Sequence, residues 1–118
     1  MGNPIIHVEV VGRDAKAIQQ FYGKLFDWNL NTDLPGGYGI AEKAGGEGPD
    51  FGAGPSQDGG AGHVTFYVRV PDIDAALARA TALGGATIMP KFSPAPNTWL
   101  ALFADPEGHV IGLTEGAM

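Results

Sequence analysis

Two histidines stand at corresponding places in two similar stretches of the chain. His7 opens the run His-Val-Glu-Val-Val, and His63 opens the run His-Val-Thr-Phe-Tyr-Val 56 positions later. Glu9 follows the first histidine by two residues, so both side chains lie on one face of a strand. A neutral imidazole can donate or accept a hydrogen bond, bind a metal or transfer a proton, and Glu9 adds a carboxylate. His7, Glu9 and His63 are therefore the candidate catalytic residues.

Hydroxyl and aromatic side chains extend this set. Thr65 and Tyr67 share the face of His63, and flat ligands stack on exposed aromatic rings. Trp99 follows a proline-rich stretch, 90–96, that is expected to be a loop at the rim of the site. A purely structural role is the alternative to a functional role for the two histidines. Ordinary packing is the alternative to ligand binding for Trp28. The candidate ligand-binding residues are Tyr67, Trp99, Thr65, Trp28 and Tyr38.

The elements that position these residues also occur twice. The first copy is expected to form a strand over 5–11, a helix capped by Asp14, and strands over 27–31, 38–43 and 51–56. The second copy is expected to form a strand over 63–70, a helix capped by Asp72, and strands over 86–89, 99–103 and 110–114. Gly84-Gly85 ends the second helix and 105–108 is a tight turn.

This repetition predicts an α+β fold of two tandem βαβββ modules, module 1 over 5–56 and module 2 over 63–114, in a single domain over 1–118. Val64, Phe66 and Val68 are expected in the core. Ile6, Val8 and Val10 share one strand face, and the first helix carries one apolar stripe of Ile18, Phe21, Tyr22, Leu25 and Phe26.

Bulk composition excludes several classes of protein. The chain has 118 residues, no cysteine and a formal net charge of −6, so a disulfide framework, a thiolate nucleophile and nucleic-acid binding are not expected. No apolar run is long enough for a membrane span, and the N-terminus does not resemble a signal peptide. A cytoplasmic protein that contacts neither membrane nor nucleic acid is expected.

The chain resembles the vicinal oxygen chelate superfamily of glyoxalase I, bleomycin-resistance proteins and extradiol dioxygenases. Three stretches carry the resemblance: residues 7–28, residues 63–85, and the turn over 103–109 that contains Asp105-Pro106-Glu107-Gly108. The resemblance implies that the modules form a curled mixed sheet around a central cup that holds a ligand. It also implies a divalent metal held by a histidine from the first strand and a glutamate from the last strand of each module.

His7 and His63 match the histidines of that pattern, but glycine stands at both glutamate positions. Gly112 occupies the position in module 2, and Gly54, or Gly52 in a shifted alignment, occupies it in module 1. Two imidazoles without carboxylates provide too few ligands for a hard cation. No metal cofactor is therefore expected. If one is present (Zn, Ni, Mn or Fe), His7, His63 and Glu9 are the residues to hold it.

Two functions follow from the resemblance. The first is metal-free binding of a small, largely apolar or aromatic molecule in the cup, for sequestration, resistance or sensing. The alternative is a glyoxalase-type lyase, isomerase or ring-cleaving dioxygenase with an atypical site on His7, Glu9 and His63, or metal-free proton transfer by Glu9 or a histidine. Exposed sheet edges predict a homodimer, and the sequence leaves open whether a second chain completes the cup.

Overall fold

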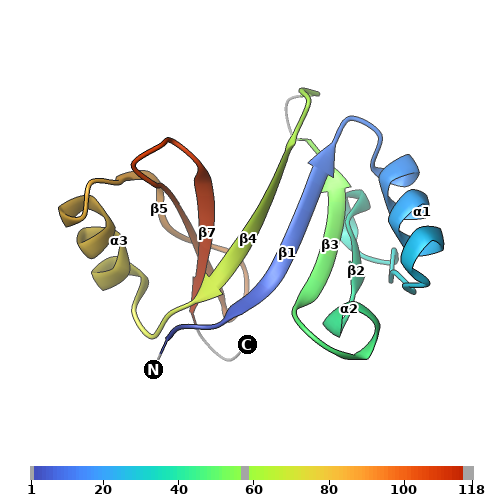
Figure 1. Cartoon of the computed structure of the whole chain (residues 1–118), viewed down its shortest axis with the longest axis horizontal. Coiled ribbons are helices and arrows are strands. Elements are labelled where there is room, and N and C mark those ends of the chain that lie inside the picture. The colour runs from blue at the N-terminus through green and yellow to red at the C-terminus, as the bar shows by residue number, and fades with distance from the viewer. Residues whose placement is uncertain (1, 57–58, 116–118) are drawn as a thin grey trace. The chain divides into compact units, whose positions relative to one another are not determined.

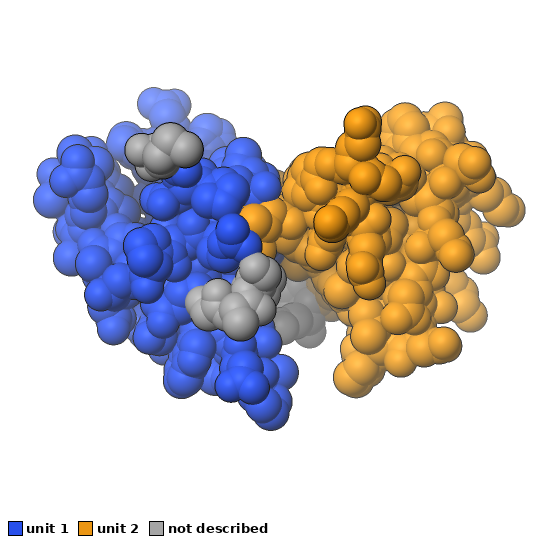
Figure 2. All heavy atoms as spheres, turned by 90° about the horizontal axis from the view of Figure 1, so that it is seen from below, with its two compact units in different colours: residues 1–5, 66–118 blue, residues 6–65 orange. Residues whose placement is uncertain are grey.

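The computed structural model describes residues 2–56 and 59–115 and divides into two compact units. We call residues 6–65 the first unit, because they precede most of the other unit along the chain (orange, unit 2 in the key of Figure 2), and residues 1–5 with 66–118 the second unit (blue, unit 1 in that key). Within the described ranges, no helix is long and apolar enough to cross a membrane.

The first unit is a three-stranded sheet with a helix (Figure 1). Its elements are β1 (Ile5–Gly12), α1 (Ala15–Phe26), the short 3-10 helix η1 (Pro35–Gly37), β2 (Gly39–Ala41), the short α2 (Lys43–Gly46) and β3 (Asp50–Pro55). Strand β3 lies in the middle, parallel to β1 and antiparallel to β2. Its register places Gly52 opposite Glu9 and Gly54 opposite Val11.

The core of the first unit lies on one face of this sheet. Its buried residues are Ala41, Phe51 and Ala53. The side chains packed against them are Val8, Val10, Ile18, Tyr22, Trp28 and Leu30. Because side chains alternate along a strand, burial of Val8 and Val10 directs His7 and Glu9 to the other face. The predicted alternation of β1 is confirmed.

Helix α1 begins where predicted, and its apolar stripe is only partly covered. Asp14 caps the helix by accepting a hydrogen bond from the amide of Ala17 (3.0 Å). Phe21, Leu25 and Phe26 remain 60%, 59% and 51% exposed. The sheet of three strands packs against the side of α1 that carries Ile18 and Tyr22.

The strand predicted over 27–31 is reduced to a single bridge between Asn31 and Ile40. Asp27 adopts a left-handed conformation (φ 58°) that ends α1. The Asn31 side chain accepts a hydrogen bond from the amide of Asp33 (3.0 Å), which turns the chain away from β2. The first unit therefore has one strand fewer than predicted.

The second unit contains most of β4 (His63–Arg69), with α3 (Ile73–Ala82), β5 (Ala86–Ala95), β6 (Thr98–Ala104) and β7 (Val110–Glu115). The strand order is β4-β7-β6-β5, with β4 parallel to β7 and the other pairs antiparallel. Its core comprises Val70, Ile73, Leu77, Ala101 and Leu113. The βαβββ order predicted for this module is confirmed.

The predicted turns of the second unit are also confirmed. Asp72 caps α3 through the amide of Ala75 (3.1 Å), and Gly84 follows the helix in a left-handed conformation (φ 102°). The turn after β6 is closed by a hydrogen bond from the Asp105 amide to the His109 carbonyl (2.9 Å).

Two expectations for the second module were wrong. The proline-rich stretch is not a loop: β5 continues to Ala95 and pairs with β6 through several register shifts. An edge strand tolerates proline, because its outer amides need no partner in the sheet. Val64, expected in the core, is 72% exposed, whereas Thr65 on the opposite face is 7% exposed. The predicted α+β class is confirmed despite these differences.

Candidate functional site

Four side chains of the first unit form one continuous hydrogen-bonded chain. His7 Nε2 lies 2.7 Å from the Tyr38 hydroxyl, and that hydroxyl donates to Glu9 Oε1 (3.0 Å). The second carboxylate oxygen, Glu9 Oε2, lies 2.8 Å from His63 Nε2. The order is His7, Tyr38, Glu9, His63, and we call this set the polar network. It unites all three predicted catalytic residues with Tyr38.

The direction of donation along the polar network follows from its chemistry. The Tyr38 hydroxyl has one proton, which it donates to Glu9. The proton in the bond between His7 and Tyr38 must therefore come from His7 Nε2. Glu9 thus accepts hydrogen bonds at both oxygens, one from Tyr38 and one from the imidazole of His63. The carboxylate is the acceptor on which the network converges.

Burial determines the protonation state of His7. Burial lowers the pKa of His7 below its usual value of 6.5, and the nearby carboxylates of Glu9 and Asp50 oppose this shift without cancelling it. His7 is consequently neutral at pH 7, in agreement with its role as a single Nε2–H donor to Tyr38. The side chain of Glu9 is 13% exposed and that of His63 is 54% exposed. His63 is therefore the end of the network that solvent reaches most easily.

Tyrosine rings lie over the glycines that stand at the glutamate positions implied by the resemblance. A Cβ atom built on Gly54 would collide with the ring of Tyr38, and one built on Gly112 would collide with the ring of Tyr67. A Cβ on Gly52 would also collide with Tyr38 and would lie 2.6 Å from His7 Nε2. The register pairs Gly54 with Val11 and Gly112 with Tyr67, which are equivalent positions when the strands are aligned on His7 and His63.

These residues do not fit the divalent metal that the resemblance implies. Residues 2–56 and 59–115 contain no group of three or more His, Cys, Asp or Glu side chains that could hold a metal ion. Nε2 of His7 is bonded to Tyr38 and Nε2 of His63 to Glu9, so the two imidazoles do not converge on a common point. Glycine provides no donor atom at either glutamate position, and a tyrosine ring fills the space above each glycine.

The other predicted ligand-binding residues are not among the four side chains of the polar network. Trp28 packs against Phe51 (ring centroids 4.8 Å apart) on the core face, opposite His7 and Glu9. Tyr67 and Trp99 belong to the second unit, where Lys91 Nζ lies 4.9 Å from the centroid of the Trp99 ring. Thr65 is buried in β4 of the first unit.

Sequence reasoning included Tyr38 only as an aromatic wall and missed its central position. The contact between Tyr38 and His7 is long-range and has no local signal in the sequence. The two residues are 31 positions apart, and they meet because β3 lies between β1 and β2. Gly52 and Gly54 are a usable indication that an aromatic ring packs on β3. Such a ring needs residues without side chains beneath it.

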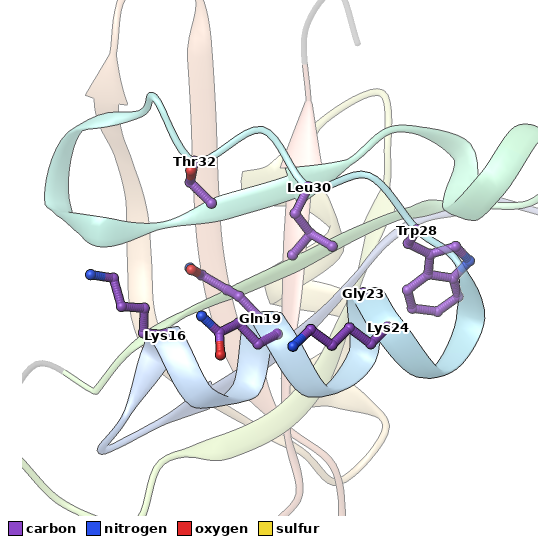
Figure 3. A pocket seen from close by; sticks show the side chains of 8 residues that line it. Lys16, Gln19, Gly23, Lys24, Trp28, Leu30 and Thr32 are labelled. Atoms are coloured by element: carbon purple, nitrogen blue, oxygen red, sulfur yellow. The ribbon is translucent and has the colours of Figure 1, made fainter.

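A separate pocket lies on the α1 side of the first unit (Figure 3). It has a volume of about 360 Å³. Its lining residues are Lys16, Gln19, Gln20, Gly23, Lys24, Trp28, Leu30 and Thr32. None of the four residues of the polar network lines it, so it is a second feature and not part of the same site.

Comparison with known proteins identifies relatives by sequence and by fold. The family model described as a glyoxalase-like domain matches residues 7–114. The proteins named "Putative glyoxylase CFP32" from Mycobacterium bovis and Mycobacterium tuberculosis are each 29% identical over 112 residues. That alignment covers 90% of this chain and 43% of each relative. The chain thus spans less than half the length of these curated relatives.

Among solved structures, methylmalonyl-CoA epimerase from M. tuberculosis matches with a TM-score of 0.70 at 19% identity, covering 98% of this chain and 89% of that one. A hypothetical protein from Bacillus halodurans matches with a TM-score of 0.69 at 19% identity, covering 100% and 97%. At such identities the matches show the fold alone, and they confirm the predicted one. Because the family model extends from His7 to Thr114, the chain belongs to the glyoxalase-like family of the vicinal oxygen chelate superfamily.

Proposed function

We propose that this protein binds a small, largely apolar or aromatic molecule without a metal, and that the polar network holds an oxygen atom of that molecule. The observation that supports this proposal most is the carboxylate of Glu9, 13% exposed and hydrogen-bonded at both oxygens. Buried polar groups held in place by partners fix the orientation of a ligand at little entropic cost.

A ligand that approaches from solvent reaches the polar network at His63. Its side chain is 54% exposed, whereas Glu9 behind it is largely shielded from solvent. A hydroxyl group that approaches the network meets this imidazole first and can donate to its Nδ1, because its Nε2 proton is donated to Glu9. Sequestration or sensing requires no further chemistry.

Metal independence is the second part of the proposal. It is supported by the donor set, since two histidines that bond to Tyr38 and Glu9 are not available to one cation. It is also supported by the rings of Tyr38 and Tyr67, which cover Gly54 and Gly112.

The test is a calorimetric titration with 1-phenylethanol, a small aromatic alcohol, using protein purified without chelators and then treated with EDTA. Under the proposal the dissociation constant is unchanged by EDTA. The dissociation constant rises roughly 10- to 150-fold in Glu9→Gln and His63→Gln, because hydrogen bonds that involve a charged group contribute about 1.5–3 kcal/mol. His109→Gln is the matched control, since His109 lies in the turn after β6 and, within residues 2–56 and 59–115, its hydrogen bonds go to Asp105. Stoichiometric Zn, Ni, Mn or Fe in the purified protein, with binding lost in EDTA, would overturn the proposal.

A second candidate is metal-free proton transfer on a carbonyl compound. It is favoured by the position of Glu9, because a shielded carboxylate beside a neutral histidine is suited to general-base chemistry. Glu9 would remove a proton from the carbon next to the carbonyl, and the proton would return to the neighbouring carbon or to the same one. The names of the curated relatives and of the epimerase structures are compatible with this reaction class.

Turnover distinguishes the two candidates. The hemithioacetal of methylglyoxal and glutathione is incubated with EDTA-treated protein in D2O, and proton NMR follows deuterium uptake at carbon. Uptake that is lost in Glu9→Gln and kept in His109→Gln establishes the enzyme. Binding of 1-phenylethanol with no exchange at carbon establishes the binding protein.

A further inference from the structure

The pocket beside α1 carries a charge pattern opposite to that of the whole protein. The chain has a formal net charge of −6 and only seven Lys and Arg residues, yet two of these, Lys16 and Lys24, line this one pocket. No Asp or Glu lines it. Neither lysine forms a salt bridge with any acid in the described part of the chain. Two cations therefore face the same cavity without a counter-charge.

The spacing of these lysines on the helix allows them to act together. Lys16, Gln20 and Lys24 follow one another at intervals of four residues and lie along one row of α1. A rise of 1.5 Å per residue places the two lysines on the order of 12 Å apart along the axis, with Gln20 midway. Both ammonium groups can reach an anionic group held near Gln20, which adds an amide donor.

The remaining walls of the pocket are positioned by contacts outside it. Gln19 Nε2 donates to the carbonyls of Gly37 and Ala53, each at 2.9 Å, and so ties α1 to the neighbouring segments. Trp28 packs between Phe26 and Phe51, with ring centroids 5.0 and 4.8 Å away. These contacts hold an amide and an indole in place beside the lysines (Figure 3).

Gly23 keeps the helix close to the segment that forms the far wall. A Cβ at this position would lie 3.2 Å from the Trp28 carbonyl oxygen and 3.5 Å from Leu30 Cδ1. Glycine in a helix interior costs roughly 0.5–1 kcal/mol relative to alanine. Here it permits the close approach that brings Leu30 and Trp28 opposite the lysines, as the close-up shows (Figure 3).

From these observations we infer that the pocket is a second binding site, separate from the polar network, for a small aromatic anion. A carboxylate or phosphate lies between Lys16 and Lys24 near Gln20, and the flat apolar part lies against Trp28 and Leu30. The volume of about 360 Å³ matches a ligand of one or two rings.

The chain provides its own reporter for the test. It contains two tryptophans, so Trp99→Phe leaves Trp28 as the only one, at the wall of the pocket. In this background, 4-nitrobenzoate is titrated while the Trp28 fluorescence is recorded, because nitroaromatic compounds quench indole on contact. Neutral 4-nitrobenzamide is the matched ligand without the charge. Saturable quenching by the benzoate, with weaker binding of the amide, is expected.

Substitutions at the lysines locate the site. Lys16→Gln and Lys24→Gln each raise the dissociation constant of 4-nitrobenzoate about two- to fivefold, and the double variant raises it further. Lys43→Gln removes the same charge outside the pocket and leaves the constant unchanged. The constant also rises with salt, because exposed charges are screened. Quenching that is linear in ligand concentration, equal binding of benzoate and benzamide, or an equal loss in Lys43→Gln would each overturn the inference.

Discussion

The hydroxyl of Tyr38 donates to Oε1 of Glu9 across 3.0 Å, although 29 residues separate the two along the chain. The same hydroxyl oxygen accepts the Nε2 proton of His7. Tyr38 therefore joins the two predicted polar residues of β1, which would otherwise be separate side chains on one strand face. The candidate site depends on this tyrosine as much as on the histidines.

Tyr38→Phe is expected to lower the free energy of unfolding by about 1 kcal/mol, because the hydrogen bonds to His7 and Glu9 are lost while the ring still covers Gly54. Urea unfolding followed by far-UV circular dichroism measures the change. Tyr22→Phe is a suitable control, since that ring packs on Phe51. An equal loss of stability in both variants would show that the hydroxyl of Tyr38 contributes nothing specific.

The lowered pKa of His7 predicts a dependence of stability on pH. The unfolded chain binds a proton near pH 6.5, whereas the folded chain does so only at lower pH. Between the two pKa values the unfolded state holds more protons, so stability increases as the pH rises toward 6.5 and is constant above it. His7→Gln should remove this contribution.

The measurement is the difference in urea-unfolding free energy between the parent chain and His7→Gln at pH 5, 6, 7 and 8. Other titrating groups cancel in this difference if they are independent of His7. A difference that favours the parent chain more at pH 5 than at pH 7 would mean that the pKa of His7 is raised, contrary to its burial.

Gly112→Ala is expected to destabilise the second unit by about 1–3 kcal/mol, since the added methyl group collides with the ring of Tyr67. Gly2→Ala is the control, because nothing lies within 4 Å of its added Cβ. A double-mutant cycle with Tyr67→Ala gives the coupling between the two positions. Zero coupling would show that the ring does not limit the side chain at position 112.

Lys91 and Glu115 provide a prediction for acid conditions. The hydrogen bond from Lys91 (2.7 Å) and a second one from the Ile73 amide lower the pKa of Glu115 below its usual 4.5. The resulting stabilisation is present above pH 4.5 and is lost as the pH falls through the lowered value. Lys91→Met should therefore destabilise the chain more at pH 6 than at pH 3, as measured by urea unfolding. A larger effect at pH 3 would contradict the assignment.

The sequence indicates the fold well because its signals are local. Asp14 and Asp72 cap their helices as expected, and Gly84 ends α3. Tertiary context determines what these signals do not: an apolar stripe on α1 finds too small a sheet to cover Phe21, and the prolines of β5 are tolerated because that strand lies at an edge.

The candidate site is predictable only in part for the same reason. The alternation of β1 predicts that His7 and Glu9 share a face. The contact of Tyr38 with both depends on the strand order β2-β3-β1, which no local pattern determines. The pocket beside α1 is likewise hidden, since Lys16 and Lys24 resemble ordinary solvated lysines until the segment around Leu30 is placed opposite them.

The tyrosine rings stacked on Gly54 and Gly112 couple each glycine to its tyrosine. Placing glutamate at position 54 or 112 by a single substitution forces a carboxylate into space that Tyr38 or Tyr67 already occupies. An acidic side chain at either position therefore requires a second substitution, at the tyrosine. The variant that lacks only the tyrosine has neither the ring nor the acid, so each glycine and its tyrosine have to be exchanged as a pair.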